Sequence, residues 1–125
     1  MIKKYLVIGN PIKHSLSPKL HNFWIKKNNI NAIYEKKKKN KDKKNDLISQ
    51  IKKNNIHGIN VTVPFKKAVI PHLDSLSLES ENTQSVNTIY LNNNKVIGHN
   101  TDIEGFARSI EIFKSSIINK KVLIL

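Results

Sequence analysis

The chain of 125 residues contains no cysteine, which excludes a disulfide framework and thiol chemistry. It also lacks any apolar run that approaches the roughly 18 residues of a membrane-spanning helix. The first four residues, MIKK, lead into an apolar stretch that is too short for the core of a signal peptide. We therefore expect a cytoplasmic protein with no membrane partner.

Histidine and glycine occur, but not in the patterns of a metal or cofactor site. The five histidines show none of the spacings that are typical of metal sites, so we expect no metal. The four glycines are Gly9, Gly58, Gly98 and Gly105. None of them forms the G-x-G-x-x-G turn that holds a dinucleotide pyrophosphate. We expect no cofactor-binding residue within this chain.

Arginine is nearly absent, although the formal net charge is +13. Of the 22 basic residues only Arg108 is an arginine, the residue that most often reads bases and binds phosphates with two hydrogen bonds. The densest lysine run, residues 36–44, contains no aromatic side chain that could stack on a base. We therefore expect no nucleic-acid partner and interpret this run as a solvated loop. A basic surface could also speed the encounter with a small anion.

Residues 58–66 (GINVTVPFK) are the most informative segment. Apolar and polar residues alternate, which predicts a strand over 57–62, and Pro64 ends it. Lys66 follows at the carboxyl end of that strand, the edge at which open α/β sheets bind ligands. Lys66 is either one more surface lysine or a proton donor to a reacting oxygen.

Two further segments place polar side chains at helix starts. Residues 5–9 predict a first strand, after which Ser17-Pro18 predicts a helix with Ser17 as its N-cap and Pro18 at its first helical position. Ser15 and Ser17 then lie where free backbone N–H groups favour an anion, or they serve only as turn and cap. After Gly98, Thr101 or Asp102 is expected to cap a helix over about 102–114.

Strands alternate with helices along most of the chain. Further strands are expected at 32–36 and in a hairpin over 86–98, and a helix at about 44–54, with irregular helical turns from the third strand through Leu78. The fold class is therefore α/β, with a mixed, largely parallel sheet flanked by helices.

Taken together, these segments resemble the shikimate dehydrogenase family. Its substrate-carboxylate motif appears as residues 14–18 (HSLSP) with His21 and Asn22, and its catalytic-lysine motif as residues 60–66 (NVTVPFK). A third motif appears as residues 86–88 (VNT), and a fourth as residues 100–102 (NTD) with Gly105. The order and spacing are similar to those of the family, and the resemblance runs from about Met1 to the last residue.

The resemblance implies reversible reduction of 3-dehydroshikimate to shikimate with NADPH, in aromatic amino-acid biosynthesis. It implies that Lys66 and Asp102 form the catalytic pair, that two serines bind the ring carboxylate and that the other residues hold the ring hydroxyls. The implied substrate-binding residues are Ser15, Ser17, Thr62, Lys66, Asn87 and Asp102.

Members of this family are about twice as long, and their second half is a dinucleotide-binding domain. The resemblance therefore implies a shikimate-binding catalytic domain over 1–101, a connecting helix and linker over 102–119, and the first strand of a truncated dinucleotide-binding domain over 120–125. The NADP site would lie in the missing C-terminal domain. We expect the chain alone to be inactive.

Two other functions stay open at this point. One is a quinate/shikimate dehydrogenase that uses NAD, because the missing domain selects the cofactor. The other is a non-catalytic module that binds a hydroxylated cyclic acid, and a homodimer is left open in either case. A coding sequence that continues past Leu125 into a Gly-rich turn would distinguish the enzymes from the module.

The chain departs from the family pattern before residues 86–88. The family usually has a small Gly-Ala pair there, whereas this chain has Gln84-Ser85. We expect the bulkier glutamine to affect the local turn and leave the role of Asn87 unchanged.

Overall fold

The computed structural model describes residues 1–38 and 44–123 and contains one six-stranded sheet in the order β2-β1-β3-β5-β6-β4. The strands are β1 (Lys3–Gly9), β2 (Ala32–Lys38), β3 (Gly58–Val61), β4 (Ser75–Leu76), β5 (Thr88–Asn92) and β6 (Lys95–His99). β1 pairs in parallel with β2 and β3, and β4 pairs in parallel with β6, whereas β5 is antiparallel to β3 and β6. The expected mixed, largely parallel α/β sheet is confirmed.

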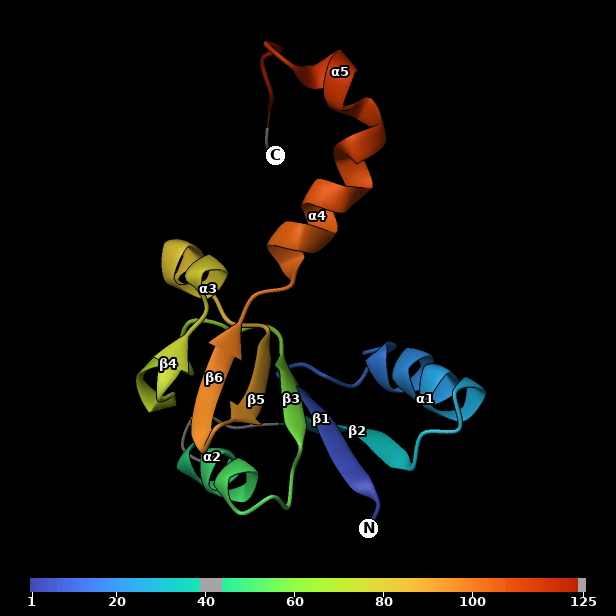
Figure 1. Ribbon diagram of the computed structural model, residues 1–125, viewed down its shortest axis with the longest axis vertical. Coiled ribbons are helices and arrows are strands. Elements are labelled where there is room, and N and C mark those ends of the chain that lie inside the picture. Colours follow the sequence, from blue (N-terminus) through green and yellow to red (C-terminus); the bar gives the residue numbers. More distant parts are fainter. Residues whose placement is uncertain (39–43, 124–125) are drawn as a thin grey trace.

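Helices cover both faces of this sheet and continue beyond it (Figure 1). They are α1 (Ser17–Lys27), α2 (Lys44–Lys52), the 3-10 turn η2 (Ile70–His72), α3 (Leu78–Thr83), α4 (Asp102–Ile110), the 3-10 turn η3 (Glu111–Phe113) and α5 (Lys114–Ile117). Within the described residues, none of these helices is long and apolar enough to cross a bilayer.

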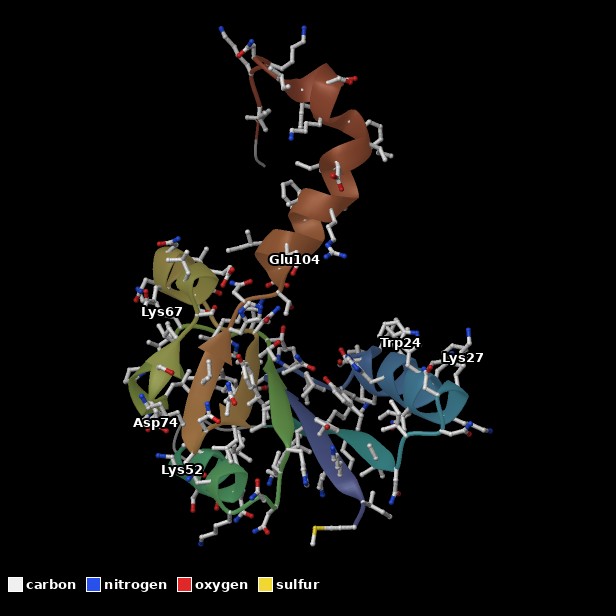
Figure 2. The ribbon with its side chains drawn as sticks, viewed as in Figure 1. Trp24, Lys27, Lys52, Lys67, Asp74 and Glu104 are labelled. Atoms are coloured by element: carbon white, nitrogen blue, oxygen red, sulfur yellow. The ribbon has the colours of Figure 1, made fainter. Side chains whose placement is uncertain are left out.

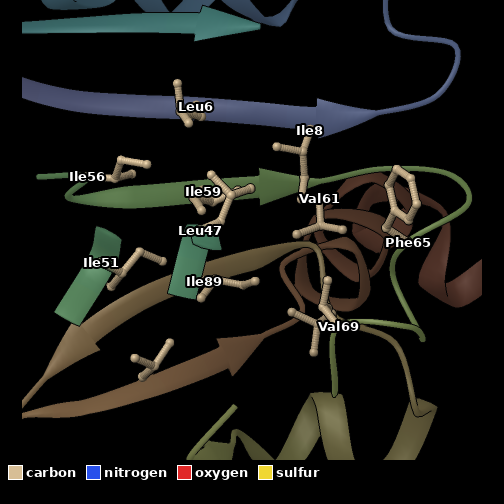
Figure 3. Close-up of a cluster of buried hydrophobic side chains, with 12 residues drawn as sticks. Leu6, Ile8, Leu47, Ile51, Ile56, Ile59, Val61, Phe65, Val69 and Ile89 are labelled. Atoms are coloured by element: carbon tan, nitrogen blue, oxygen red, sulfur yellow. The ribbon is translucent and has the colours of Figure 1, made fainter. Parts of the chain in front are cut away.

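The main core lies between the sheet and α2 (Figure 3). Successive strand residues point to opposite faces, so Leu6 and Ile8 face this core together. They meet Leu47 and Ile51 of α2, and Ile51 is fully buried. Burying each such side chain contributes on the order of 1.5–3 kcal/mol, which makes this contact the main support of the sheet.

The opposite face carries a smaller core beneath α1. Val7 and Tyr34 are buried there, and Ile25 of α1 packs against them. Asn22 of α1 locks the helix to β2, because its side chain donates to the Tyr34 carbonyl oxygen (2.8 Å) and accepts from the Tyr34 N–H (3.0 Å). The Asn22 amide thus provides both hydrogen bonds that a neighbouring strand would otherwise supply.

The C-terminal segment projects away from the sheet (Figure 1). The helix expected over 102–114 is split into α4, η3 and α5, and its apolar residues Phe106 and Ile112 are 66% and 81% exposed. The strand expected over 120–125 is not formed in residues 120–123, and residues 124–125 lie outside the described residues. A strand requires a neighbouring strand for its hydrogen bonds, and none lies beside this segment in the described part of the chain.

Other expectations also need correction. Residues 36–38 are not loop, because they complete β2, and residues 39–43 of the expected loop lie outside the described residues. Lys36–Lys38 therefore form an exposed basic end on the outermost strand of the sheet. The region after β3 contains β4 and α3, both of which the sequence reading missed. Ser77 caps α3 by accepting from the Ser80 N–H, a Ser N-cap signal that could have revealed this helix.

We predict that Gln84→Gly stabilises the fold by about 0.5–1 kcal/mol. Gln84 ends α3 in the left-handed region (φ 50°, ψ 39°), where a Cβ is unfavourable and glycine is preferred. The matched control is Gln84→Ala, which keeps the Cβ but loses the 2.8 Å bond from the side chain to the Glu81 carbonyl oxygen. In chemical unfolding, the free energy of unfolding should be highest for Gln84→Gly, lower for the parent and lowest for Gln84→Ala. An equal loss in both variants would mean that the side-chain bond outweighs the backbone conformation.

We also predict that Asp74 stabilises the fold in a pH-dependent manner. Its carboxylate accepts from the Val96 N–H (2.8 Å) and pairs with Lys52 (3.0 Å; both side chains are labelled in Figure 2). These contacts, the backbone bond first, hold the pKa of Asp74 below its usual value of 3.8. The unfolded chain therefore takes up this proton first as the pH falls, and the stabilisation is complete only above that value.

Asp74→Ala should accordingly lower the melting temperature at neutral pH, and the difference from the parent should shrink as the pH falls below 3.8. Thermal unfolding at several pH values measures this, with the exposed Glu111→Ala as a control. A difference that stays constant with pH would exclude the carboxylate as its cause.

Candidate functional site

The expected site residues lie at one edge of the sheet, which is formed by the carboxyl ends of β1, β3 and β6 and by the start of β5. β1 and β3 run parallel and end there, β5 begins there, and β6 ends there before α4. Figure 2 shows the first turn of α4, marked by Glu104, directly beyond this edge. Segments that lie far apart in the sequence therefore supply polar side chains to one place.

Lys66 and Asp102 form an ion pair at this edge. The Lys66 Nζ lies 2.6 Å from Asp102 Oδ2, and the two side chains are 33% and 57% exposed. The backbone of Lys66 is anchored to the rest of the domain, because the preceding Phe65 is buried in the main core and the Lys66 carbonyl oxygen accepts from the Val86 N–H (2.9 Å). An exposed pair of this kind adds little stability, so its value lies in placing a cation and a carboxylate together.

Asn87 joins this pair from β5's side of the sheet edge. Its Nδ2 donates to the other Asp102 oxygen, Oδ1 (3.0 Å), and to the Thr101 hydroxyl (2.8 Å). Its backbone donates to the His99 carbonyl oxygen and accepts from the Val61 N–H. Lys66 and Asn87 thus both bind the Asp102 carboxylate, one at each oxygen.

Asn100 belongs to the fourth motif, but the sequence predicted no role for it in the site. It is 4% exposed, and its Oδ1 accepts from the Asp102 N–H (2.9 Å) while its Nδ2 donates to the Ser85 carbonyl oxygen (3.0 Å). Asn100 therefore satisfies the start of α4, and neither Thr101 nor Asp102 caps the helix by its side chain, contrary to expectation. The signal was present, because an asparagine side chain often accepts from the N–H two residues on.

Ser15 and Ser17 lie at the start of α1, apart from the ion pair. Ser17 is the first residue of the helix, and Leu16 occupies the N-cap position without a side-chain bond, so the expected Ser17 cap is wrong. The Ser15 hydroxyl instead accepts from the Ser17 N–H (3.3 Å). No hydrogen bond among the described residues joins either serine to Lys66, Asn87 or Asp102. Both hydroxyls remain able to donate to an anion.

Thr62 connects the two parts of the site. A Cβ added to Gly9 would approach the Thr62 methyl carbon to 2.5 Å, so only glycine lets the loop after β1 pass this close. Backbone bonds from the Thr62 N–H to Ile8 and from the Asn10 N–H to Val63 hold the two loops together. Thr62 therefore lies between the loop that carries the two serines and the loop that carries Lys66.

The arrangement suits a small polar molecule with a negative charge. Hydroxyls and N–H groups at a helix start favour an anion, while the cation, carboxylate and amide at the far side can bind hydroxyl groups. The residues present do not fit a dinucleotide, because Gly58, Gly98 and Gly105 lie within β3, β6 and α4, and the space beside Gly9 is filled. No cluster of His, Cys, Asp or Glu that could hold a metal occurs in the part of the chain that is described.

Comparisons with known proteins identify the family. The family model described as "Shikimate dehydrogenase substrate binding domain" matches residues 7–89. A curated shikimate dehydrogenase (NADP(+)) of Pelagibacter ubique is 62% identical over 125 residues, which are 100% of this chain and 47% of that protein. The chain thus spans about half the length of the curated relatives it matches.

Solved structures agree with this match. The shikimate dehydrogenase of Aquifex aeolicus has a TM-score of 0.81 and 39% identity, over 89% of this chain and 42% of that chain. The shikimate 5-dehydrogenase of Thermus thermophilus, crystallised with shikimate, has a TM-score of 0.82 and 29% identity, over 89% and 42% of the two chains. The chain belongs to the shikimate dehydrogenase family and corresponds to its N-terminal, substrate-binding domain.

Proposed function

We propose that this chain is the substrate-binding and catalytic half of an NADP-dependent shikimate dehydrogenase, which interconverts 3-dehydroshikimate and shikimate. The observation that carries the proposal is the Lys66–Asp102 ion pair, at 2.6 Å, with the Asn87 amide bound to the same carboxylate. The names of the relatives support the choice of NADP and of this substrate. We also propose the cytoplasm as its location, which suits the cysteine-free composition.

Two groups of residues would hold the substrate by its opposite ends. We infer that the hydroxyls of Ser15 and Ser17 donate to the ring carboxylate at the start of α1. Thr62, Asn87 and Asp102 would bind the ring hydroxyls from the sheet edge. The separation of the serines from the ion pair supports this division, since a ring between them would meet an anion site at one end and hydroxyl ligands at the other.

Lys66 would be the proton donor. Reduction of a ketone leaves negative charge on its oxygen, and that oxygen needs a proton from a group in hydrogen-bond reach. The Lys66 ammonium can donate this proton, and the Asp102 carboxylate fixes its direction. In the reverse direction, the neutral amine would accept the proton of the shikimate hydroxyl.

The cofactor would bind outside this chain. NADP supplies the hydride chemistry of the proposed reaction, but the glycines described above provide no turn for its pyrophosphate. We propose that residues 1–101 form the shikimate-binding catalytic domain and residues 102–119 a connecting helix and linker. Residues 120–125 would begin a dinucleotide-binding domain, as the first strand of its sheet.

The test of the proposal is an enzyme in which this chain replaces the matching part of the Pelagibacter ubique relative. This chimera should oxidise shikimate with NADP. Lys66→Ala should lower its kcat by about 10²–10⁴-fold, the range for loss of a general acid, with a much smaller change in KM. The matched control is Lys67→Ala, since Lys67 is the exposed neighbouring lysine (labelled in Figure 2). Near-parental turnover of Lys66→Ala would remove Lys66 from the mechanism.

The anion site has a separate test. The double variant Ser15→Ala and Ser17→Ala should bind shikimate about 1–3 kcal/mol more weakly, because two hydrogen bonds to a charged group are lost. In the parent, the amide of shikimate should bind more weakly than shikimate by a similar free energy. Calorimetry on the chimera measures both, with Ser49→Ala on α2 as the control. Unchanged binding by the double variant would mean that the carboxylate is held elsewhere.

A further inference from the structure

A chain of polar side chains crosses the α1 face of the sheet and ends at Asn87. It starts at Tyr34 on β2, a residue that is only 4% exposed. The Tyr34 hydroxyl lies 2.7 Å from Asn60 Oδ1 on β3. Because β1 lies between β2 and β3, the phenol reaches across one whole strand to make this bond.

The Asn87 carbonyl oxygen can only accept a hydrogen bond, and this fixes the donor and acceptor in the bonds of Asn60. Asn60 Nδ2 lies 3.3 Å from the Asn87 carbonyl oxygen and 3.1 Å from the Thr88 hydroxyl. A backbone carbonyl has no proton to give, so the nitrogen of the Asn60 amide must face it. Asn60 Oδ1 then faces Tyr34, and the phenol is the donor. Burial raises the pKa of Tyr34 to about 12, so the phenol keeps the proton that it donates.

The same logic continues to the carboxylate. The Thr88 hydroxyl accepts from Asn60, so its own proton is available for Asn87 Oδ1, at 3.0 Å. The Thr101 N–H donates to the same oxygen (3.1 Å). With its oxygen held by two donors, the Asn87 amide must turn its Nδ2 toward Asp102. The reverse orientation would place the amide oxygen against the carboxylate.

We propose that Tyr34, Asn60 and Thr88 are positioning residues, which orient the Asn87 amide and through it the Asp102 carboxylate that directs Lys66. This inference rests on the proposed function. None of the three side chains makes a hydrogen bond to Lys66 or Asp102 in the described structure, so each would act only through Asn87.

The starting point of the chain is itself fixed. Asn22 binds both backbone groups of Tyr34, and the His21 ring stacks on the phenol ring, with centroids 4.2 Å apart and planes within 6°. His21 and Asn22 belong to the helix that begins at Ser17. The helix that carries the anion end of the site is therefore tied to Tyr34, the residue at which the chain of hydrogen bonds to Asn87 begins.

The experiment uses the active chimera and the variant Thr88→Val, which keeps the shape of the side chain and removes its hydroxyl. We expect kcat/KM for shikimate to fall about 5–20-fold, with the KM for NADP changed less than 2-fold. Thr88→Ser restores the hydroxyl and should recover most of the loss. Tyr34→Phe, at the far end of the chain of hydrogen bonds, should lower kcat/KM for shikimate about 2–5-fold. The control Tyr90→Phe on β5 should have the kcat/KM of the parent.

A double-mutant cycle separates positioning from general damage to the fold. If Thr88 acts through Asn87, Thr88→Val should have almost no further effect in an Asn87→Ala background. If Thr88→Val lowers kcat/KM by the same factor in both backgrounds, the inference is overturned. A Thr88→Val variant as active as the parent would also overturn it. If Thr88→Val does not fold, the cycle of Tyr34→Phe with Asn87→Ala decides by the same criterion. A parent chimera without shikimate oxidation overturns the proposed function instead.

Discussion

The candidate site depends on the hydrogen bonds of one side chain, the amide of Asn87. Its nitrogen binds Asp102 and Thr101, and its oxygen is held by Thr88 and the Thr101 N–H. Its backbone bridges β3 and the end of β6. Three loops that are separate in the sequence are thus held in one arrangement, and the charged pair of Lys66 and Asp102 depends on it. A partly exposed ion pair alone would not hold these loops, because its net free energy is small.

The sheet provides a rigid base for the hydrogen bonds that connect Tyr34 on β2 to the Asn87 amide. Both faces of β1 are covered, one by the α2 core and the other by α1, so the strands cannot shift against each other without exposing apolar surface. The polar chain from Tyr34 runs over this rigid base. Its members are partly or fully buried, where an unmade hydrogen bond is costly and a complete set defines one geometry.

The sequence predicted those features that depend on local pattern. Alternation in residues 57–62 and the hairpin over 86–98 located β3, β5 and β6, and the end of the third strand placed Lys66 at the ligand-binding edge. The family resemblance, and not the local pattern, selected Asn87 and Asp102. Features that depend on a distant partner were not predictable in this way. The bond from Asn100 to Ser85 and the bond from Tyr34 to Asn60 are contacts of this kind, which no spacing in the chain indicates. The predicted Ser17 cap was wrong for a local reason, because the helix begins one residue earlier than predicted, with Leu16 at the N-cap position.

The outermost strands of the sheet have a consequence for self-association. β4 offers only two residues for pairing, and β2 ends in Lys36, Lys37 and Lys38, which are exposed. A second copy that paired along β2 would bring two lysine-rich strands to within about 4.8 Å, where their charges repel. The lysine surplus therefore also protects the open edge of the sheet against aggregation at high protein concentration.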